Sequence, residues 1–340
     1  MDSITHIALG ACMGEAFAGK KLGKKAMLWG ALAQSAPDID FISSFWMNTP
    51  DGLLAHRGFT HSFLFCLLLT PLMAFAAEKW HRPHNIKLSK WLLFFGGVIF
   101  IHIFIDAFNN YGTGWFEPFS HTRISFNAIY VADPFFSTWT IISFIVLLVM
   151  KRNNKDRKLW WRFGLGLSAT YLVYCLVNKR TIDKDVKEIL HDKNISYTQY
   201  LSTPAPLQNW LWYIVAGNDS GYYIGYRSAF DYKKDMDIHY FPRNEYLLEA
   251  LKSKEDLHKL IRFSQNFYTV QKQNDTLIFN DLRFGQVVGW YDRNEEFVFH
   301  YYLNQEDNAL VVQRGRFAKW NKKSFDALLS RIRGEQPASK

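Results

Sequence analysis

Four apolar stretches of nearly membrane-spanning length constrain the fold of this chain more than any other feature. They are His61–Ala77, Trp91–Phe108, Phe135–Met150 and Trp160–Val177, and the single Lys or Arg among them is Arg162. Arg162 lies one turn from an end, where a long cationic side chain can snorkel to the interface. A helix needs roughly 17–25 residues to cross the hydrocarbon core, so each stretch gains length from its flanks. The sequence therefore predicts membrane insertion.

Two earlier stretches, Ile4–Gly19 and Ala26 to about Phe45, are rich in Gly and Ala. Small residues suit close helix packing in a membrane bundle. Glu15 and Gln34 should then face the protein interior, because polar side chains are costly in lipid. Two crossings and a re-entrant hairpin both fit this pattern. The predicted fold is an α-helical membrane bundle of about six segments, the first two of which could form a hairpin.

The distribution of basic residues predicts the orientation of the bundle. Three loops rich in Lys and Arg alternate with two that are poor in them: Lys20–Lys25, Lys79–Lys90 and Lys151–Lys158, against Pro50–Thr60 and Asn109–Ala132. The positive-inside rule places the basic loops in the cytoplasm. The N-terminus, the two intervening loops and everything after Asn178 are then expected on the extracytoplasmic side of a multi-pass protein.

After Asn178 the pattern becomes that of a soluble α+β domain. The expected divisions are a membrane-embedded domain over residues 1–178, a soluble domain over 179–335 and a disordered tail over 336–340. Apolar residues at three- and four-residue spacing predict helices, and aromatic and β-branched runs predict strands. The helices are Ile182–Lys193, Glu245–Phe263 and Ser324–Ile332, and the strands are Tyr222–Phe230, Thr276–Phe279, Gln286–Tyr291, Glu296–Leu303 and Ala309–Gln313.

Composition disfavours two other classes of protein. The net charge of +9 suggests nucleic acid, but the basic residues do not form one stripe with interleaved aromatics, so no nucleic-acid partner is expected. The three cysteines, Cys12, Cys66 and Cys175, all lie in apolar stretches and form neither a disulfide framework nor a CxxC metal pair. We interpret them as buried hydrophobic residues.

The ionisable residues of the membrane half fall at one end of its segments. His and Asp residues begin or end five of them, all on the predicted outer side: His6, Asp38, Asp40, His56, His61, His102, Asp106 and Asp133. None of these residues was used to set the orientation. Ionisable residues in or beside a membrane are costly and tend to be functional. Their convergence at one level predicts a site there.

The residue types and spacings favour a divalent metal. His102 and Asp106 project from one helix face, one turn apart, while His56 and His61 flank a Gly-containing turn. Mixed imidazole and carboxylate ligation suits Zn²⁺, Mn²⁺ or Fe²⁺. The candidates exceed what one tetrahedral ion needs, so either two metals bind or some residues are outer partners or general bases. Each motif taken alone can also be interpreted as purely structural, as a helix end or a surface loop.

The order Pro37-Asp38-Ile39-Asp40, then His56 to Ser62 (HRGFTHS), then His102 to Asp106 (HIFID) resembles the YdjM-like family. Members of this family carry the labels LexA-binding, inner membrane-associated hydrolase and membrane-bound metal-dependent hydrolase. The resemblance covers roughly Met1 to Met150 and implies a bacterial inner-membrane location. The family's metal-site pattern falls on His6, Asp38, Asp40, His56, His61, His102 and Asp106.

The function expected from these residues is hydrolysis of an ester or phosphoester by a metal-activated water. His6, Asp40, His61, His102 and Asp106 are the expected ligands of one or two ions, with Zn²⁺ or Mn²⁺ favoured. The expected catalytic groups are Asp38 or His56, as general base or second-metal ligand, and Arg57, as a stabiliser of developing negative charge.

The depth of the site favours a lipid-borne substrate. His102 would lie roughly 17 Å along a helix that begins at Trp91, below the headgroup level. The alternative to a hydrolase is a non-catalytic membrane protein whose structural metal site serves a partner-binding or regulatory module. A transporter is disfavoured, because a transporter should have ionisable residues through the membrane depth, whereas those of this chain cluster at one end. The protein partner, the oligomeric state and the role of the C-terminal domain stay open.

Overall fold

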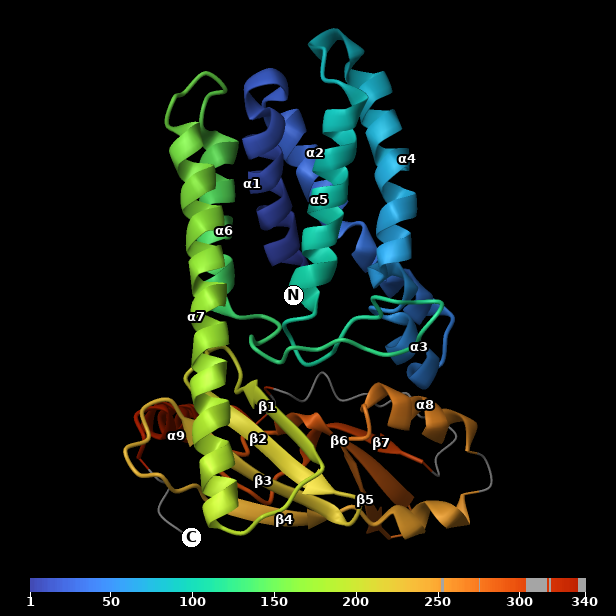
Figure 1. Ribbon diagram of the computed structural model, residues 1–340, viewed down its shortest axis with the longest axis vertical. Helices are drawn as coiled ribbons and strands as arrows, with labels where there is room; N and C mark the ends of the chain where they lie inside the picture. Colours follow the sequence, from blue (N-terminus) through green and yellow to red (C-terminus); the bar gives the residue numbers. More distant parts are fainter. Residues whose placement is uncertain (252–253, 275, 304–316, 318, 336–340) are drawn as a thin grey trace. The chain divides into compact units, whose positions relative to one another are not determined.

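The chain divides into two compact units in the computed structural model, which describes residues 1–251, 254–274, 276–303, 317 and 319–335 (Figure 1). The first unit comprises Met1–Phe45 with Ala55–Cys175, and the second comprises Trp46–Leu54 with Leu176–Lys340. The tail predicted over 336–340 and the strand predicted at Ala309–Gln313 lie outside the described residues.

The regular elements of the first unit are mainly helices. Its elements are α1 (Ser3–Leu22), α2 (Lys24–Ser35), η1 (Pro37–Phe45), η2 (Phe59–His61), α4 (Phe63–His81), η3 (Arg82–His84), α5 (Leu88–Asp106), α6 (Pro134–Val149) and the first part of α7 (Arg157–Asp192). Three helices begin at a residue whose side chain accepts a hydrogen bond from a backbone N–H of the first turn: Asp2 for α1, Ser62 for α4 and Asp133 for α6. Such caps satisfy donors that a helix start leaves unpaired.

Helices α1 and α2 pack at backbone contact because glycines face one another. A Cβ atom added to Gly10 would lie 2.3 Å from the carbonyl oxygen of Gly30, so no larger residue fits there. This is the small-residue packing that membrane helices use. The prediction that Glu15 and Gln34 face the interior is confirmed, since both are buried. Glu15 Oε2 accepts a hydrogen bond from Arg157 Nη2 at 2.6 Å.

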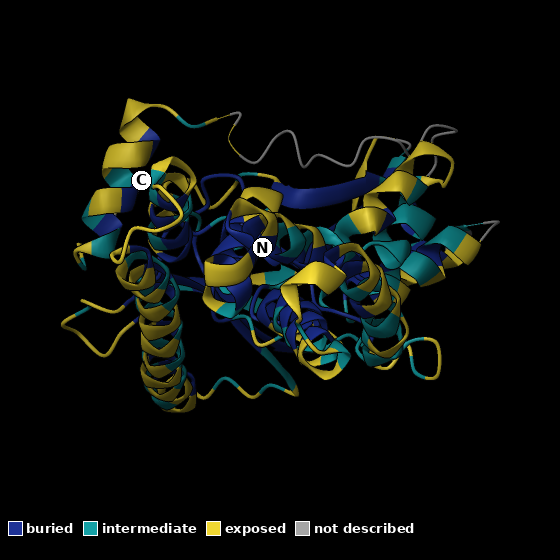
Figure 2. Ribbon diagram, turned by 90° about the horizontal axis from the view of Figure 1, so that it is seen from above, coloured by how far each residue is buried: buried dark blue, intermediate teal, exposed yellow. Residues whose placement is uncertain are grey.

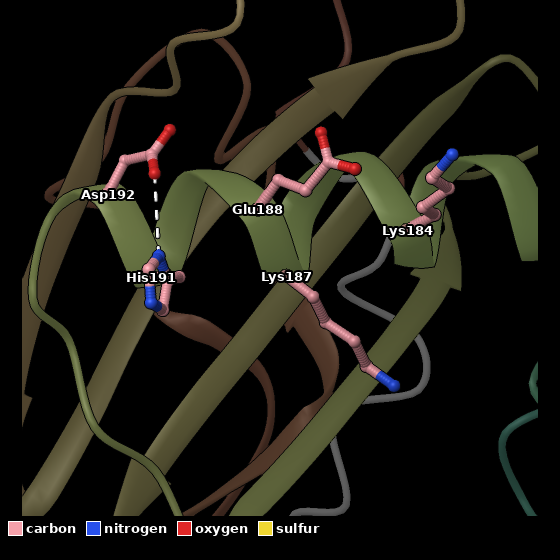
Figure 3. Close-up of a pocket in the computed structure, with 5 residues that line it drawn as sticks. All are labelled: Lys184, Lys187, Glu188, His191 and Asp192. Atoms are coloured by element: carbon pink, nitrogen blue, oxygen red, sulfur yellow. Dashed lines mark hydrogen bonds and ion pairs between the residues drawn. The ribbon is translucent and has the colours of Figure 1, made fainter.

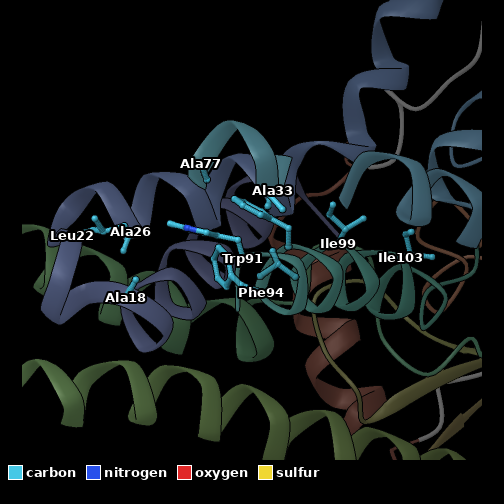
Figure 4. Packing of buried hydrophobic residues seen from close by; sticks show 12 residues of the cluster. Ala18, Leu22, Ala26, Ala33, Ala77, Trp91, Phe94, Ile99 and Ile103 are labelled. Atoms are coloured by element: carbon cyan, nitrogen blue, oxygen red, sulfur yellow. The ribbon is translucent and has the colours of Figure 1, made fainter. Parts of the chain in front are cut away.

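The largest apolar cluster of the first unit joins α1, α2, α4 and α5 (Figure 4). Small residues from α1, α2 and α4, such as Ala18, Ala33 and Ala77, lie against large ones from α5, such as Trp91 and Phe95. Alternating small and large side chains across facing helices fill the interior without voids. The cluster holds α5 in place, and α5 carries His102 and Asp106 at its end.

Two helices among the described residues are long and apolar enough to cross a membrane, Phe63–His84 and Leu88–Asp106. About 11% of the first span's apolar window is buried and 44% of the second's, and the outward faces are coloured yellow and teal in Figure 2. The expectation of about six membrane segments is not supported. Helices α2 and α6 have 12 and 16 residues, about 18 and 24 Å, against a hydrocarbon core of about 30 Å. Helices α1 and α7 are long enough, but α1 contains several Gly and the charged Glu15, Lys20 and Lys21, and α7 contains Gly, Tyr and many charged residues.

The second unit is rich in β-sheet. Its described elements are a four-stranded antiparallel sheet of β1 (Gln199–Pro204), β2 (Leu211–Asn218), β3 (Gly221–Ser228) and β4 (Ile238–Pro242), and a three-stranded one of β5 (Tyr268–Gln273), β6 (Thr276–Gln286) and β7 (Phe297–Tyr302). The helical elements are most of α3 (Thr49–Ala55), the end of α7, η4 (Glu245–Ala250), α8 (Glu255–Phe263) and α9 (Lys322–Ile332).

Strand β2 lies at the centre of this unit because both of its faces are covered. Trp212 and Ile214 pack against the end of α7, where Val186 contributes to the same cluster. Tyr213 and Val215 belong to a second cluster that includes residues of β6 and β7. Successive side chains of a strand point to opposite faces, so alternate residues of β2 serve the two clusters.

The predicted helices and strands of this unit differ from the structure in several places. The helix predicted over Glu245–Phe263 is two pieces, η4 and α8. The strand predicted over Gln286–Tyr291 is wrong, because β6 ends at Gln286 and the chain turns at Val288, whose φ is 50°. Strands β1, β2, β4 and β5 had not been predicted. Of these, β2 is buried along nearly its whole length, and a strand covered on both faces is apolar throughout and lacks clear alternation.

Candidate metal centre

Four side chains from three segments of the first unit meet at one point. Asp38 lies on η1, His61 ends η2, and His102 and Asp106 lie in the last turns of α5. Each offers one atom, and these four atoms all lie within 4.8 Å of one another. His61, His102 and Asp106 are fully buried, while the side chain of Asp38 is 19% exposed. We call these four residues the metal cluster.

The separations within the metal cluster match those of a coordination shell. His61 Nε2 lies 3.1 Å from His102 Nε2 and 3.4 Å from Asp106 Oδ2. Asp38 Oδ1 lies 3.6 Å from both imidazole Nε2 atoms, and His102 Nε2 lies 3.9 Å from Asp106 Oδ2. Donors about 2.0–2.2 Å from a tetrahedral ion lie about 3.3–3.6 Å from one another. The residues therefore fit a single divalent cation.

The outer nitrogens of the two histidines are anchored as in metal sites. His102 Nδ1 donates to the carbonyl oxygen of Gln34, and a carbonyl can only accept. His61 Nδ1 lies 3.1 Å from Thr60 Oγ1, whose hydroxyl donates to Asp40 Oδ2, and it lies 3.4 Å from that carboxylate oxygen. With its Nδ1 protonated, a neutral imidazole presents the Nε2 lone pair, the form that binds metal. Both Nε2 atoms face the cluster.

Asp106 has a buried oxygen that is not hydrogen-bonded within the described residues. Its Oδ2 faces Arg57 Nε at 3.2 Å and His61 Nε2 at 3.4 Å, but neither contact has hydrogen-bond geometry. The other oxygen, Oδ1, accepts from the amino group of Met1. A buried carboxylate oxygen without a donor is costly. A cation bound by the cluster would satisfy it, which is a second observation in favour of the fit.

Asp40 and His56 lie beside the metal cluster rather than within it. Asp40 accepts from the backbone N–H of Arg57 at 2.7 Å, and its Oδ1 lies 3.1 Å from His56 Nδ1. Arg57 has a φ of 59°, a left-handed conformation that turns the chain so that its N–H reaches Asp40. The side chain of His56 is 41% exposed, the most accessible of the histidines around the cluster.

Arg57 and His6 both contact Asp106 from buried positions. The guanidinium of Arg57 donates to Asn109 Oδ1 at 2.8 Å and to the carbonyl oxygen of Met1 at 3.3 Å. His6 Nε2 lies 3.1 Å from Asp106 Oδ1, and its ring stacks on that of His102 with centroids 3.9 Å apart. His6 therefore borders the metal cluster without offering an atom to the group of four.

The electrostatics of the site favour positive charge. Burial opposes ionisation of Asp38 and Asp40, but contacts with the surrounding histidines outweigh it and hold the pKa of both carboxyls well below the usual range. Burial also opposes charge on His61, yet contacts with Asp106, Asp38 and Asp40 raise its pKa to about 10. Carboxylates around a buried group attract a cation.

Some residues of the site were not predicted from the sequence. Thr60 contacts His61 Nδ1 and the carbonyl of Gln34 contacts His102 Nδ1, while Asn109 accepts a hydrogen bond from Arg57. Thr60 lies inside the HRGFTHS run and could have been included with it, whereas a backbone carbonyl has no sequence signal. Asp133, expected at the same level, caps the start of α6 and accepts a hydrogen bond from the hydroxyl of Tyr171 at 2.9 Å.

The second unit contains a shallow charged depression along α7 (Figure 3). Its lining residues are Lys184, Lys187, Glu188, His191 and Asp192, all from one helix. His191 and Asp192 are largely exposed, at 90% and 72%. Exposed side chains of one helix do not converge on a ligand, so we favour the metal cluster over this surface as the functional site.

The family comparison agrees with the position of the site. The model of the YdjM inner membrane protein family matches residues 1–182, more than half of the chain and all of the metal cluster. The chain belongs to this family. The YdjM family is one of inner membrane proteins, and the match ends just inside the second unit.

Two relatives were found among curated proteins. Inner membrane protein YbcI of Escherichia coli (strain K12) is 28% identical over 141 residues, which cover 41% of this chain and 73% of YbcI. The uncharacterized protein YfhP of Bacillus subtilis (strain 168) is 27% identical over 203 residues, 57% of this chain and 59% of YfhP. The chain thus spans less than two thirds of YfhP. No solved structure matches the chain.

Proposed function

We propose that this YdjM-family protein is a membrane-bound, metal-dependent hydrolase of ester or phosphoester bonds. The observation that carries the proposal is the convergence of four ligand atoms within 4.8 Å, from segments far apart in the sequence. The anchored outer nitrogens of His61 and His102 add to it, because such hydrogen bonds orient metal-binding imidazoles. The proposed ligands are Asp38, His61, His102 and Asp106. One ion fits them, and zinc or manganese suits their donor set.

A divalent ion held there would act as a Lewis acid that polarises a phosphoryl or acyl oxygen, and it would lower the pKa of water toward neutrality. We assign proton transfer to His56, whose ring is partly exposed and whose Nδ1 lies 3.1 Å from Asp40 Oδ1. The carboxylate of Asp40 holds that imidazole in one orientation and stabilises it when it gains a proton. Asp38, expected from the sequence as a base, is better placed as a ligand.

Arg57 acts in this proposal as a positioning residue for Asp106. Its side chain is only 3% exposed, and its guanidinium hydrogen-bonds to Asn109 and Met1. A guanidinium held by these acceptors cannot swing toward a substrate without losing them. His6 plays the same part from the other side of Asp106, through its contact with Oδ1.

We further propose that the site faces the extracytoplasmic side of the inner membrane. The support is the alternation of basic and non-basic loops, which places Lys79–Lys90, between α4 and α5, in the cytoplasm. The metal cluster lies at the opposite ends of both helices, since His61 precedes α4 and Asp106 ends α5. Accessibility of a cysteine introduced at His121, which is exposed, to a membrane-impermeant maleimide in whole cells would test this.

A structural metal site in a partner-binding module is the second candidate, favoured by burial. His61, His102 and Asp106 are fully buried, and closed shells are typical of structural sites, whereas catalytic ones keep an open position. X-ray absorption spectroscopy of the metal-loaded protein distinguishes the two. A shell filled by protein ligands supports the structural role, and an additional water oxygen supports catalysis.

The direct test is an assay of the purified, detergent-solubilised protein with zinc or manganese. Bis(p-nitrophenyl) phosphate and p-nitrophenyl butyrate report the two bond classes. We expect turnover by the wild type, its loss in Asp106→Ala, and a lower kcat with unchanged metal content in His56→Gln. His121→Ala is the matched control, because His121 is 60% exposed and contacts Glu117. Metal binding without turnover of either compound or of vesicle lipid would contradict the hydrolase.

A further inference from the structure

The segments that carry the metal cluster also expose large apolar side chains. On η1, Ile39, Ile42 and Phe45 are 53%, 36% and 78% exposed. Side chains three residues apart line up on a 3₁₀ helix, so these three form one outward row. Pro37 and Asp40, also three apart, are buried. The short helix therefore turns one row toward the site and another away from it.

Neighbouring segments of the first unit extend this apolar surface. Phe59 precedes the cluster ligand His61 and is 43% exposed, and Phe116 and Phe119, in the loop after α5, are 48% and 84% exposed. On η1, Phe41 is 59% exposed and its ring lies 6.4 Å from that of Phe45. We call the residues Ile39, Phe41, Ile42, Phe45, Phe59, Phe116 and Phe119 the apolar collar.

Two residues of the collar contact a candidate membrane helix. The ring of Phe59 lies 5.9 Å from that of Phe65, and the ring of Phe116 lies 5.8 Å from that of Phe63, both on α4. Farther along α4, Leu67 and Leu72 are 71% and 67% exposed. In a YdjM-family inner membrane protein this face of α4 meets lipid, and aromatic residues gather where a membrane protein crosses the interface.

We propose that the apolar collar inserts into the interfacial layer of the bilayer and opens the metal cluster to the headgroups of membrane lipids. The substrate class is then a membrane lipid with a phosphoester or acyl ester, a deduction that rests on the proposed hydrolase. Among the four cluster residues, Asp38 alone is partly exposed, and it lies on η1 directly before Ile39. The accessible edge of the site and the apolar row thus share one short helix.

Bilayer lipid is the occupant that the contacts favour. Exposed apolar patches of this kind mark interaction sites, and η1 places its polar row inward and its apolar row outward, as interfacial helices do. A second copy of the chain would also cover such a surface. The ring contacts of Phe59 and Phe116 with α4 favour lipid, because they join this part of the collar to the face of a candidate membrane helix.

Photo-crosslinking in vesicles tests the insertion without any assay of activity. The photoreactive amino acid p-benzoylphenylalanine replaces Phe45 or Phe119, in the full chain reconstituted in phosphatidylethanolamine and phosphatidylglycerol. Phe75 on α4, 57% exposed, is the positive control, and Tyr232 of the second unit, fully exposed at 102%, is the aromatic negative control. We expect lipid-mass adducts at Phe45 and Phe119 as at Phe75. Protein dimers, or no adducts at both collar positions, would overturn the insertion.

A second measurement separates the substrate class from hydrolysis itself. In the Phe41→Ser/Phe45→Ser variant, the ratio of vesicle-lipid turnover to bis(p-nitrophenyl) phosphate turnover should fall roughly tenfold, because the site no longer meets the headgroups. An unchanged ratio, or wild-type turnover of the soluble ester alone, rejects the lipid substrate. If neither compound is turned over while metal and lipid adducts are present, the hydrolase fails and the insertion stands.

Discussion

The two units of this protein bury charged side chains in different ways. In the second unit two buried carboxylates meet guanidiniums: Asp281 Oδ2 accepts from Arg283 at 2.6 Å, and Asp231 accepts from Arg331 at 2.5 and 2.8 Å. In the first unit, Asp38, Asp40 and Asp106 surround His61. The only guanidinium at this group within the described structure is that of Arg57, and its hydrogen bonds go to Asn109 and Met1.

The difference teaches how to separate structural charges from a functional site. A carboxylate paired with one arginine has its charge and hydrogen bonds satisfied locally. Carboxylates that outnumber their cations and share buried imidazoles have an unmet need for positive charge. The Glu15–Arg157 pair shows that the first unit also makes ordinary ion pairs, with contacts of 2.8 and 2.6 Å. The metal cluster is therefore a local exception within its own unit.

The largest effect is expected from removing two cluster ligands. His61→Ala/Asp106→Ala should bind no zinc or manganese above background, because two of four donors are lost. Elemental analysis of the purified protein measures this, with His121→Ala as the control. Stoichiometric metal in the double variant would mean that the ion binds at another site. The carboxylates of the first unit would then not differ from those of the second in their need for a metal.

Breaking a buried ion pair of the second unit should greatly lower the free energy of unfolding and leave the metal content unchanged. Arg331→Ala leaves Asp231 without its main partner, and breaking a buried pair costs about 3–5 kcal/mol. Thermal unfolding followed by circular dichroism and elemental analysis are measured on the same sample. Reduced metal content in the folded Arg331→Ala variant would show that the Asp231–Arg331 pair affects the metal cluster.

Weakening the partner of His61 should reduce metal affinity without abolishing it. Asp40→Asn keeps the shape of the side chain but removes its charge. Loss of such an outer partner typically costs about 10–100-fold in metal affinity. Competition with a chromogenic chelator gives the dissociation constant. An unchanged constant would mean that the charge of Asp40 does not support metal binding through His61.

The smallest effect should come from paired helix-cap variants. Ser62→Ala and Asn321→Ala each remove a side chain that caps a helix, α4 and α9 respectively, and each should cost about 1 kcal/mol. Ser62 directly follows His61, so its variant should also weaken metal binding, whereas Asn321→Ala should leave it unchanged. Equal metal affinity in both variants would show that the cap does not help to position His61.

The candidate site was largely accessible from sequence because its chemistry follows helix periodicity. His102 and Asp106 are four residues apart on one apolar helix, and the HRGFTHS run places His61 directly before another. The sequence did not show that Asp38 belongs to the metal cluster and that Asp40 lies beside it. The segment is a 3₁₀ helix, and its tighter winding changes which neighbouring side chain faces inward.

The amino-acid sequence by itself determined the apolar helices α4 and α5, the residue types of the metal cluster and the change to a soluble pattern after Asn178. These depend on local composition and spacing. Only the tertiary structure decided that Asp38 joins His61, His102 and Asp106, that Arg57 turns toward Asp106 and that β2 is covered on both faces. Such contacts join residues far apart in the chain, and their geometry depends on how whole helices and sheets pack.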